Sequence, residues 1–258
     1  SVRNEGIISI ASKLSKYKDK PMFDIEVLPS NIILNDSAWN IGQARIAYSI
    51  AEKRMDITNF SLHTDYQSII ANGTASELAT DSIDVVLNNI NLDYLLSYTE
   101  ASKAISIMGP VTGQAQVYSV FSAPMLEAQA QIRNGGLNGV YLGDVTAEAR
   151  LDRENKTILI EGEAIDSTEH RVAEVTGKVI PATKWWGLDI SCDSVDISFI
   201  DFWTKDIIAN PQGRGYGHVK VEGQEHKVWV TGRALAKEAQ ITVPQIGATF
   251  YMTDSIFL

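Results

Sequence analysis

The sequence predicts an all-β protein of antiparallel strands, whose apolar side is covered by a second sheet, by closure into a barrel, or by a guest in an elongated, curled sheet that forms a groove. Three observations lead to this prediction. Apolar and polar residues alternate with a period of two in most segments, turn-forming residues separate these segments, and helical spacing occurs in only two short places. Strict alternation places one side of each strand against an apolar medium and the other side in water. We therefore expect a meander of hairpins.

The alternation is clearest in residues 126–132 and 145–151, where Glu, Gln, Thr and Arg separate the apolar positions. Small residues at several of these positions leave room on the apolar side of the strands. The positions that we expect to line the groove are Ile83, Val85, Leu87, Leu126, Ala128, Ala130, Ile132, Val145, Ala147, Ala149, Leu151, Ile158, Ile160, Val219, Val221, Val228 and Val230.

Asn, Asp and Gly cluster between the alternating segments and predict tight turns. The expected turns lie at residues 35–36, 72–73, 134–136, 154–156 and 222–223. Gly213-Arg-Gly215-Tyr-Gly217 is spaced like a phosphate-binding loop, but it follows a helical segment and opens a strand, so we interpret it as a turn and a strand start.

Two segments, residues 91–98 and 198–208, carry apolar residues at helical spacing and predict short amphipathic helices. Each follows an Asp-Ser-apolar-Asp strand and precedes a strand that begins with glycines. This order recurs after roughly 100 residues, which indicates a repeat. We expect two continuous groove segments: residues 1–108, which end in the first helix, and residues 109–258, which contain the second.

Composition narrows the possible functions. The 258 residues include 22 Lys and Arg against 32 Asp and Glu, which gives a net charge of −10. This acidic balance argues against nucleic acid and against adhesion to an anionic membrane surface, since both require basic residues. The cluster Lys13, Lys16, Lys18 and Lys20 is interpreted as a solvated loop, with contact to lipid headgroups or a partner as the alternative.

No catalytic or metal-binding arrangement emerges from the reactive side chains. The histidines at 63, 170, 218 and 226 lack the spacing of a zinc hydrolase, and the aspartates at 189, 193 and 196 lack the Gly and Glu of a calcium loop. Cys192 cannot form an internal disulfide, and it continues an apolar alternation, so we interpret it as a small apolar residue. We expect no enzymatic activity, no metal and no cofactor.

The order of several segments resembles the TamB/AsmA-like family, the inner-membrane components of the translocation and assembly module. The resemblance covers most of residues 30–258 and rests on loose motifs in a fixed order. These are Ala44–Glu52, Met55–Leu62, Ile70–Ala75, Asp81–Leu87, Leu92–Leu96, Gly109–Gly113, Ala123–Leu126, Ile132–Asn134, Phe199–Ile208, Gly213–Gly223 and Ile246–Met252.

The resemblance implies an elongated, curled antiparallel sheet that forms an apolar β-groove, in the periplasm of a Gram-negative bacterium and within a protein anchored in the inner membrane. Such proteins are associated with phospholipid transport to the outer membrane, with outer-membrane protein assembly and with a barrel partner. Because Ser1 stands in place of an initiator methionine, we expect a piece of a longer protein, and the resemblance implies a middle-to-C-terminal fragment. The expected partners are lipid acyl chains and, through regions outside this fragment, the outer-membrane barrel protein.

Three alternatives remain open at this point. The first is a compact β-sandwich binding module, an adhesin or a glycan binder, in which Trp185, Trp186 and Tyr216 could stack on sugars. The second is an outer-membrane barrel, which would need regular aromatic girdles at the strand ends. The third is a hydrolase on an all-β scaffold.

Overall fold

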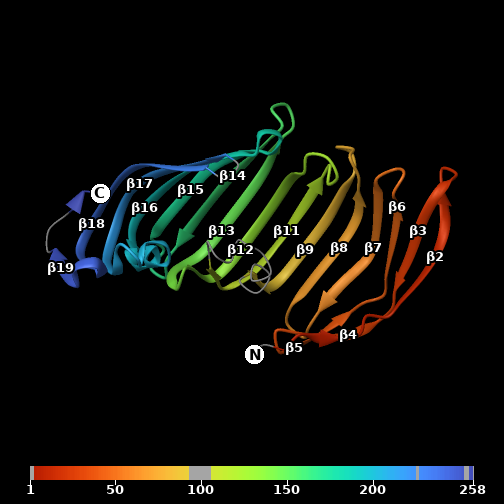
Figure 1. Ribbon diagram of the computed structural model, residues 1–258, viewed down its shortest axis with the longest axis horizontal. Coiled ribbons are helices and arrows are strands. Elements are labelled where there is room, and N and C mark those ends of the chain that lie inside the picture. The colour runs from red at the N-terminus through yellow and green to blue at the C-terminus, as the bar shows by residue number, and fades with distance from the viewer. Residues whose placement is uncertain (1–2, 93–105, 225–226, 253–255, 258) are drawn as a thin grey trace. The chain divides into compact units, whose positions relative to one another are not determined.

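The computed structural model describes residues 3–92, 106–224, 227–252 and 256–257 (Figure 1). Strands make up 72% of the chain and helices 6%, so the all-β class predicted from the sequence is confirmed. The strands belong to one large antiparallel sheet. The predicted curl of this sheet into a groove stays a prediction.

The strands are β1 (Glu5–Gly6), β2 (Ile10–Tyr17), β3 (Lys20–Val27), β4 (Ser30–Leu34), β5 (Ser37–Ile41), β6 (Ala44–Ser49), β7 (Arg54–His63), β8 (Ser68–Ala75), β9 (Ser82–Asn91), β10 (Ile107–Met108), β11 (Pro110–Tyr118), β12 (Met125–Leu137), β13 (Val140–Asp152), β14 (Thr157–Ile165), β15 (Arg171–Ile180), β16 (Trp185–Asp196), β17 (Ala209–Gln224), β18 (Lys227–Val243), β19 (Ala248–Met252) and β20 (Ile256–Phe257). The short helices are the 3₁₀ turns η2 (Pro181–Thr183), η3 (Ile197–Ile200) and η4 (Pro244–Ile246), and α2 (Asp201–Thr204).

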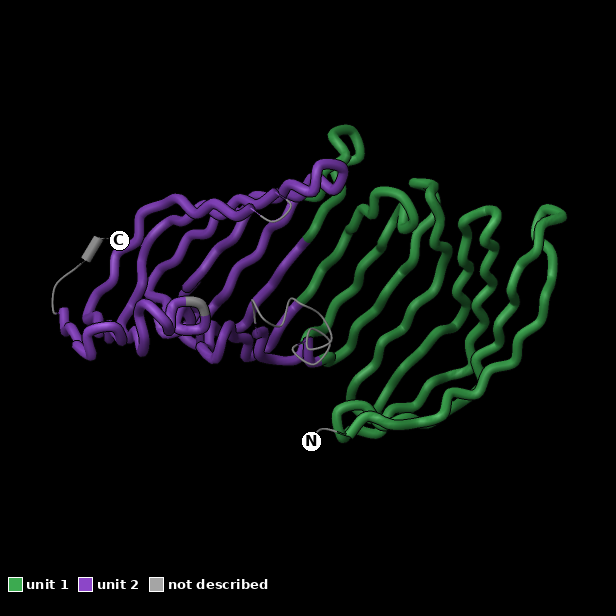
Figure 2. The backbone as a smooth tube through the Cα atoms, in the orientation of Figure 1, with its two compact units in different colours: residues 1–90, 111–130, 149–158 green, residues 91–110, 131–148, 159–258 purple. Residues whose placement is uncertain are grey.

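The chain divides into two compact units, which Figure 2 colours separately. Unit 1 comprises residues 1–90, 111–130 and 149–158, and unit 2 comprises residues 91–110, 131–148 and 159–258. Strands β12, β13 and β14 contribute residues to both units. The predicted division into segments 1–108 and 109–258 stays a prediction.

In unit 1, antiparallel pairings place β2, β3, β6, β7, β8 and β9 in that order. Strand β2 pairs with β3 alone among the described strands, so it is an edge strand of this unit. The β4–β5 hairpin is inserted between β3 and β6, and its strand β5 also pairs with β7. The hairpin turns at Asn35 and Asp36, both with positive φ, as the sequence predicts.

In unit 2, β15, β16, β17 and β18 form successive antiparallel pairs. Strand β18 is long, and its second half pairs on the other side with β19 and β20. A bulge at Ser194, which has φ 65°, interrupts the β16–β17 register between Asp193 and Val195.

The two predicted helices are not confirmed. The segment 91–98 lies mostly outside the described residues. The segment 198–208 forms only the 3₁₀ turn η3, capped by the Asp196 carboxylate at 2.9 Å from the Ser198 amide, and the single α-helical turn α2. This helix ends at Thr204, whose hydroxyl lies 3.1 Å from the Ile200 carbonyl oxygen and 2.9 Å from that of Ile208. The chain therefore turns back into β17 before a second helical turn can form.

Some predicted turns lie inside strands. The turn at residues 154–156 is confirmed, whereas residues 72–73, 134–136 and 222–223 lie within β8, β12 and β17, and Gly213–Gly217 also lies within β17. Gly73 (φ 123°), Asn134 (φ 50°) and Gly213 (φ 123°) adopt positive φ, which bends a strand at a bulge without ending it. The local turn chemistry is present, but strand pairing on both sides overrides it.

Candidate functional site

In unit 1, the pairing register collects apolar side chains on one side of the sheet. Directly paired residues of antiparallel strands share a side, so each row of partners can be followed across several strands. The apolar face of unit 1 is defined by Leu14, Phe23, Tyr48, Met55 and Ala75 in one row, Ile25, Ile46, Ile57, Gly73 and Ile83 in the next, and Phe60, Ala71, Val85, Leu62, Ile69 and Leu87 beyond them.

Three of the predicted groove residues lie together on this face. Ile83, Val85 and Leu87 are half-buried, at the positions that the alternation of β9 assigns to them. The intervening residues Asp84 and Val86 are exposed and lie on the opposite side. The three residues therefore share one side of β9, as alternation along a strand requires, and their role in a groove stays a prediction.

Unit 2 has a second apolar face with the same construction. It is defined by Val175, Ile190, Val219 and Gly232 in one row, Gly177, Leu188, Val221 and Val230 in the next, and Val179, Trp186, Gly223 and Val228 in the last. Four predicted groove residues of β17 and β18 lie on it. Val219 and Val221 are half-buried, whereas Val228 and Val230 are 59% and 64% exposed.

The tryptophan pair Trp185 and Trp186 shows how sharply this unit separates its two sides. Trp186 lies over Gly223, so closely that a Cβ atom added to that glycine would overlap the indole ring. Trp185 pairs with Ile180 and Gln224 on the opposite side, where its ring lies against Gly187. A glycine thus provides the space for each ring, and the two rings belong to different sides of the sheet.

The remaining predicted groove residues lie on β12, β13 and β14. Most of them are half-buried, namely Leu126, Ala128, Ala130, Ile132, Val145, Ala149, Leu151 and Ile160. Two of the predicted groove residues on these strands differ in exposure. Ala147 is exposed, and Ile158 is 8% exposed and therefore belongs to the core.

Each unit covers a small part of its apolar surface with its own chain. In unit 1, Ile32 and Ile41 from the β4–β5 hairpin pack with Val27, Ala44 and Phe60. In unit 2, Phe199 from η3 packs with Val195 and Cys192, in a cluster that also includes Ala164 and Val172. These clusters bury only a few side chains, and large apolar residues such as Val228 and Val230 remain outside them.

Sequence alternation alone missed part of the unit 1 face. Ile57 and Phe60 lie on the same side although they are three residues apart, because the register shifts at a bulge where Asn59 has φ 58°. The bulge is fixed by the Asn72 side chain, whose Oδ1 accepts a hydrogen bond from the Asn59 amide at 2.6 Å. The Asn at position 59, a residue tolerant of positive φ, was the available signal.

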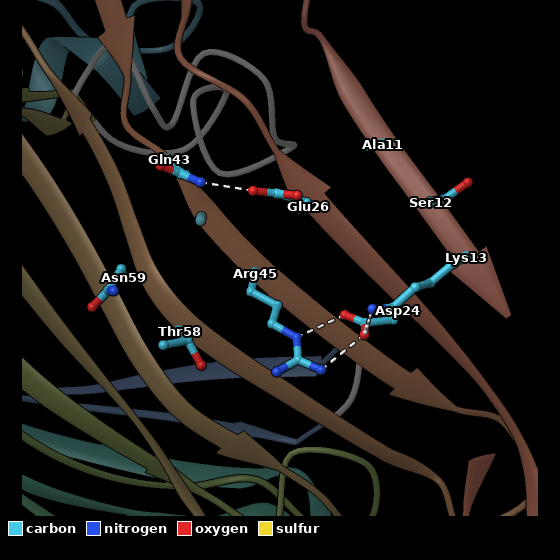
Figure 3. Close-up of a pocket in the computed structure, with 10 residues that line it drawn as sticks. Ala11, Ser12, Lys13, Asp24, Glu26, Gln43, Arg45, Thr58 and Asn59 are labelled. Atoms are coloured by element: carbon cyan, nitrogen blue, oxygen red, sulfur yellow. Dashed lines mark hydrogen bonds and ion pairs between the residues drawn. The ribbon is translucent and has the colours of Figure 1, made fainter. Parts of the chain in front are cut away.

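The opposite side of unit 1 is polar around β3 and β6 (Figure 3). Arg45 donates two hydrogen bonds of 2.7 and 2.8 Å to Asp24, and Lys13 lies 3.5 Å from the same carboxylate. The Arg45 hydrogen bonds hold the pKa of Asp24 below its ordinary value. A pocket of about 520 Å³ opens here, with Gln43 donating to Glu26 at 2.7 Å. Both cations of the pocket contact Asp24, whereas the Glu26 carboxylate accepts from the neutral amide of Gln43.

Reactive side chains are dispersed in the described part of the chain. His170 lies 3.3 Å from Asp193 and His218 lies 3.6 Å from Asp189, each as an isolated pair. Among the described residues, no group of three His, Cys, Asp or Glu side chains is placed to hold a metal ion. Burial raises the pKa of the Cys192 thiol, which packs against apolar neighbours.

Within the described ranges, no helix has both the length and the hydrophobicity needed to cross a bilayer. No protein-family model, curated protein or solved structure matches this chain. The resemblance to the TamB/AsmA-like family therefore rests on the sequence motifs alone. In each unit, the candidate site is therefore an apolar face that the described part of the chain covers only in part.

Proposed function

We propose that this chain is a non-enzymatic lipid carrier, whose apolar faces bind the acyl chains of phospholipids. The observation that carries the proposal is the exposure of Val228 and Val230 on the same face as the half-buried Val219 and Val221. Large apolar surface exposed to water is unfavourable by about 25 cal/mol per Å², so a surface of this kind marks a site for an apolar partner.

The energetics favour an apolar path without a polar anchor. A chain of sixteen carbons loses about 0.8 kcal/mol for each CH₂ group that leaves an apolar phase, roughly 13 kcal/mol in all. A row of Val, Ile, Leu and Ala side chains provides a similar apolar environment, so the free energy of transfer from the bilayer to the protein is close to zero. The bound lipid can therefore move along the surface and leave it again, as transport requires.

Charge supports the same assignment. The chain carries a net charge of −10, and the polar side of unit 1 holds its cations in ion pairs. An acidic exterior keeps such a protein in solution and repels anionic headgroups from that side. From these charges and the sequence resemblance, we propose that the chain is located in the periplasm. There it would be part of a bridge-like protein that supports phospholipid transport and outer-membrane biogenesis.

A compact β-sandwich binding module agrees less well with the arrangement. In a sandwich, a second sheet covers the inner apolar side at a spacing of about 10 Å. Val228 and Val230, exposed by more than half, would be inner residues in such a fold. No specific observation favours a glycan site, since Trp185 and Trp186 lie on opposite sides of the sheet.

The proposal is tested with two variants of neighbouring exposed residues on β18, Val230→Glu and Thr231→Glu. Both add one negative charge, but Val230 lies on the apolar face and Thr231 on the opposite side, paired with Lys220. The proteins are purified from a Gram-negative host, and their phospholipids are extracted and quantified by mass spectrometry. We expect lipid with the wild type and Thr231→Glu, and at least a fivefold loss with Val230→Glu. Absence of lipid from the wild type, or equal lipid in both variants, would overturn the proposal.

A further inference from the structure

The first half of β18 has a side that no described strand occupies. β18 pairs with β17 along one side from Lys227 onward. On its other side, β20 pairs with Leu235 and Ala236, and β19 pairs with Ala239–Val243. Within the described residues, residues 227–234 therefore have no strand partner on that side. Such an edge presents unpaired backbone N–H and C=O groups that can extend a sheet by one strand.

The side chains of this edge favour strand pairing. All residues from 227 to 233 are exposed, and three consecutive ones, Val228, Trp229 and Val230, are β-branched or aromatic residues with a high preference for strands. Natural edge strands are usually protected by a central charge, a proline or a bulge. The edge strand β2 of unit 1 follows this rule with Lys13 and Lys16, whereas the centre of the β18 edge is uncharged and apolar.

The two ends of the edge are basic. Lys227 and Arg233 lie on the same side of the sheet as Trp229, and neither forms an ion pair with a described residue. On β17, Glu222 pairs with Trp229 on this side of the sheet, and its carboxylate lies 3.1 Å from the ammonium group of Lys220. Carboxylates placed opposite Lys227 and Arg233 would therefore be complementary to this edge.

We propose that residues 227–234 of β18 bind an extended segment of another protein, in which two acidic residues flank an apolar, strand-forming centre. The backbone of the segment continues the sheet, and its alternate side chains meet the edge residues one by one. A second copy of the chain fits poorly. In the antiparallel register centred on Val230, two copies would place Lys227 opposite Arg233, where like charges repel.

The test uses a synthetic peptide that follows this pattern, Thr-Glu-Val-Thr-Val-Tyr-Val-Glu. In antiparallel pairing with residues 227–234, its two Glu residues lie opposite Arg233 and Lys227, and its Tyr lies opposite Trp229. The comparison peptide carries Lys in place of both Glu residues. Binding of the labelled peptides to the intact chain is measured by fluorescence anisotropy at low salt, and hydrogen exchange locates the protected amides.

We expect the Glu peptide to bind at least tenfold more tightly than the Lys peptide and to protect amides within residues 227–234. In the double variant Lys227→Glu with Arg233→Glu, the preference is expected to reverse. Lys156→Glu with Lys184→Glu is the matched control, since it changes the net charge equally at two exposed turn residues, and it leaves the preference unchanged. Equal binding of both peptides, protection elsewhere, or a wild-type dimer in sedimentation would overturn the proposal. Because neither residue is on the apolar face, lipid content is unaffected by the double variant.

Discussion

Truncation of Val230 to alanine measures directly how much of its side chain the protein covers. The substitution removes two methyl groups from a side chain that is 64% exposed. Each fully buried group contributes about 0.8 kcal/mol to stability. Because only a little over a third of the side chain is covered, removal of the two groups predicts a loss near 0.6 kcal/mol. Ile90 provides the comparison, since it is 2% exposed in the core of unit 1. Ile90→Ala is expected to cost about 2–5 kcal/mol, because it leaves a cavity.

The assay is urea unfolding followed by circular dichroism. Thr231→Ala, at an exposed position on the other side of β18, corrects for the lower strand preference of alanine. We expect Val230→Ala to cost only about 0.6 kcal/mol more than Thr231→Ala, and Ile90→Ala to lower the unfolding midpoint far more. A loss for Val230→Ala as large as that for Ile90→Ala would mean that protein covers this face in solution, which would refute the reasoning.

Three further predictions test single contacts. Arg45 lowers the pKa of Asp24, so the stability that this contact confers is present above about pH 4 and is lost as the pH falls through the lowered pKa. The variant Asp24→Asn should therefore show a smaller difference between its urea midpoints at pH 6 and pH 3 than the wild type. An unchanged difference would contradict this prediction. Gly223→Ala should destabilise unit 2 by about 1–3 kcal/mol, because the added methyl group overlaps Trp186, and an unaltered melting temperature would argue against that packing. Burial raises the pKa of Cys192 and so lowers the fraction of the reactive thiolate. Iodoacetamide should therefore alkylate the folded chain at least about tenfold more slowly than the unfolded chain at pH 8, and equal rates would contradict this.

The period-two pattern predicted the fold class and the side on which many residues lie. Ile83, Val85 and Leu87 share a face because alternate residues of a strand point the same way, and this holds whatever the neighbouring strands are. Burial could not be predicted in the same way. Ile158 is in the core and Ala147 is exposed, although both occupy apolar positions of alternating segments, because burial depends on segments far away in the sequence.

Helix and turn predictions failed where tertiary pairing outweighed local preference. The apolar spacing in residues 198–208 predicts a helix, yet the segment ends its helical turn at Thr204 and Phe199 packs into the core of unit 2. Gly223 predicts a turn, but it serves to accommodate the Trp186 ring within β17. The bulge at Asn59 shifts Phe60 onto the apolar face, which no fixed period could anticipate.

The most direct test of the central claim is photo-crosslinking at four consecutive positions of β18. A benzoylphenylalanine residue is placed in turn at Val228, Trp229, Val230 and Thr231, and adducts formed in living bacteria are identified by mass spectrometry. Because these positions alternate between the two sides of the sheet, phospholipid adducts are expected at Val228 and Val230 and not at Trp229 or Thr231. Equal labelling at all four positions, or lipid adducts on neither valine, would contradict the account that the apolar face binds acyl chains.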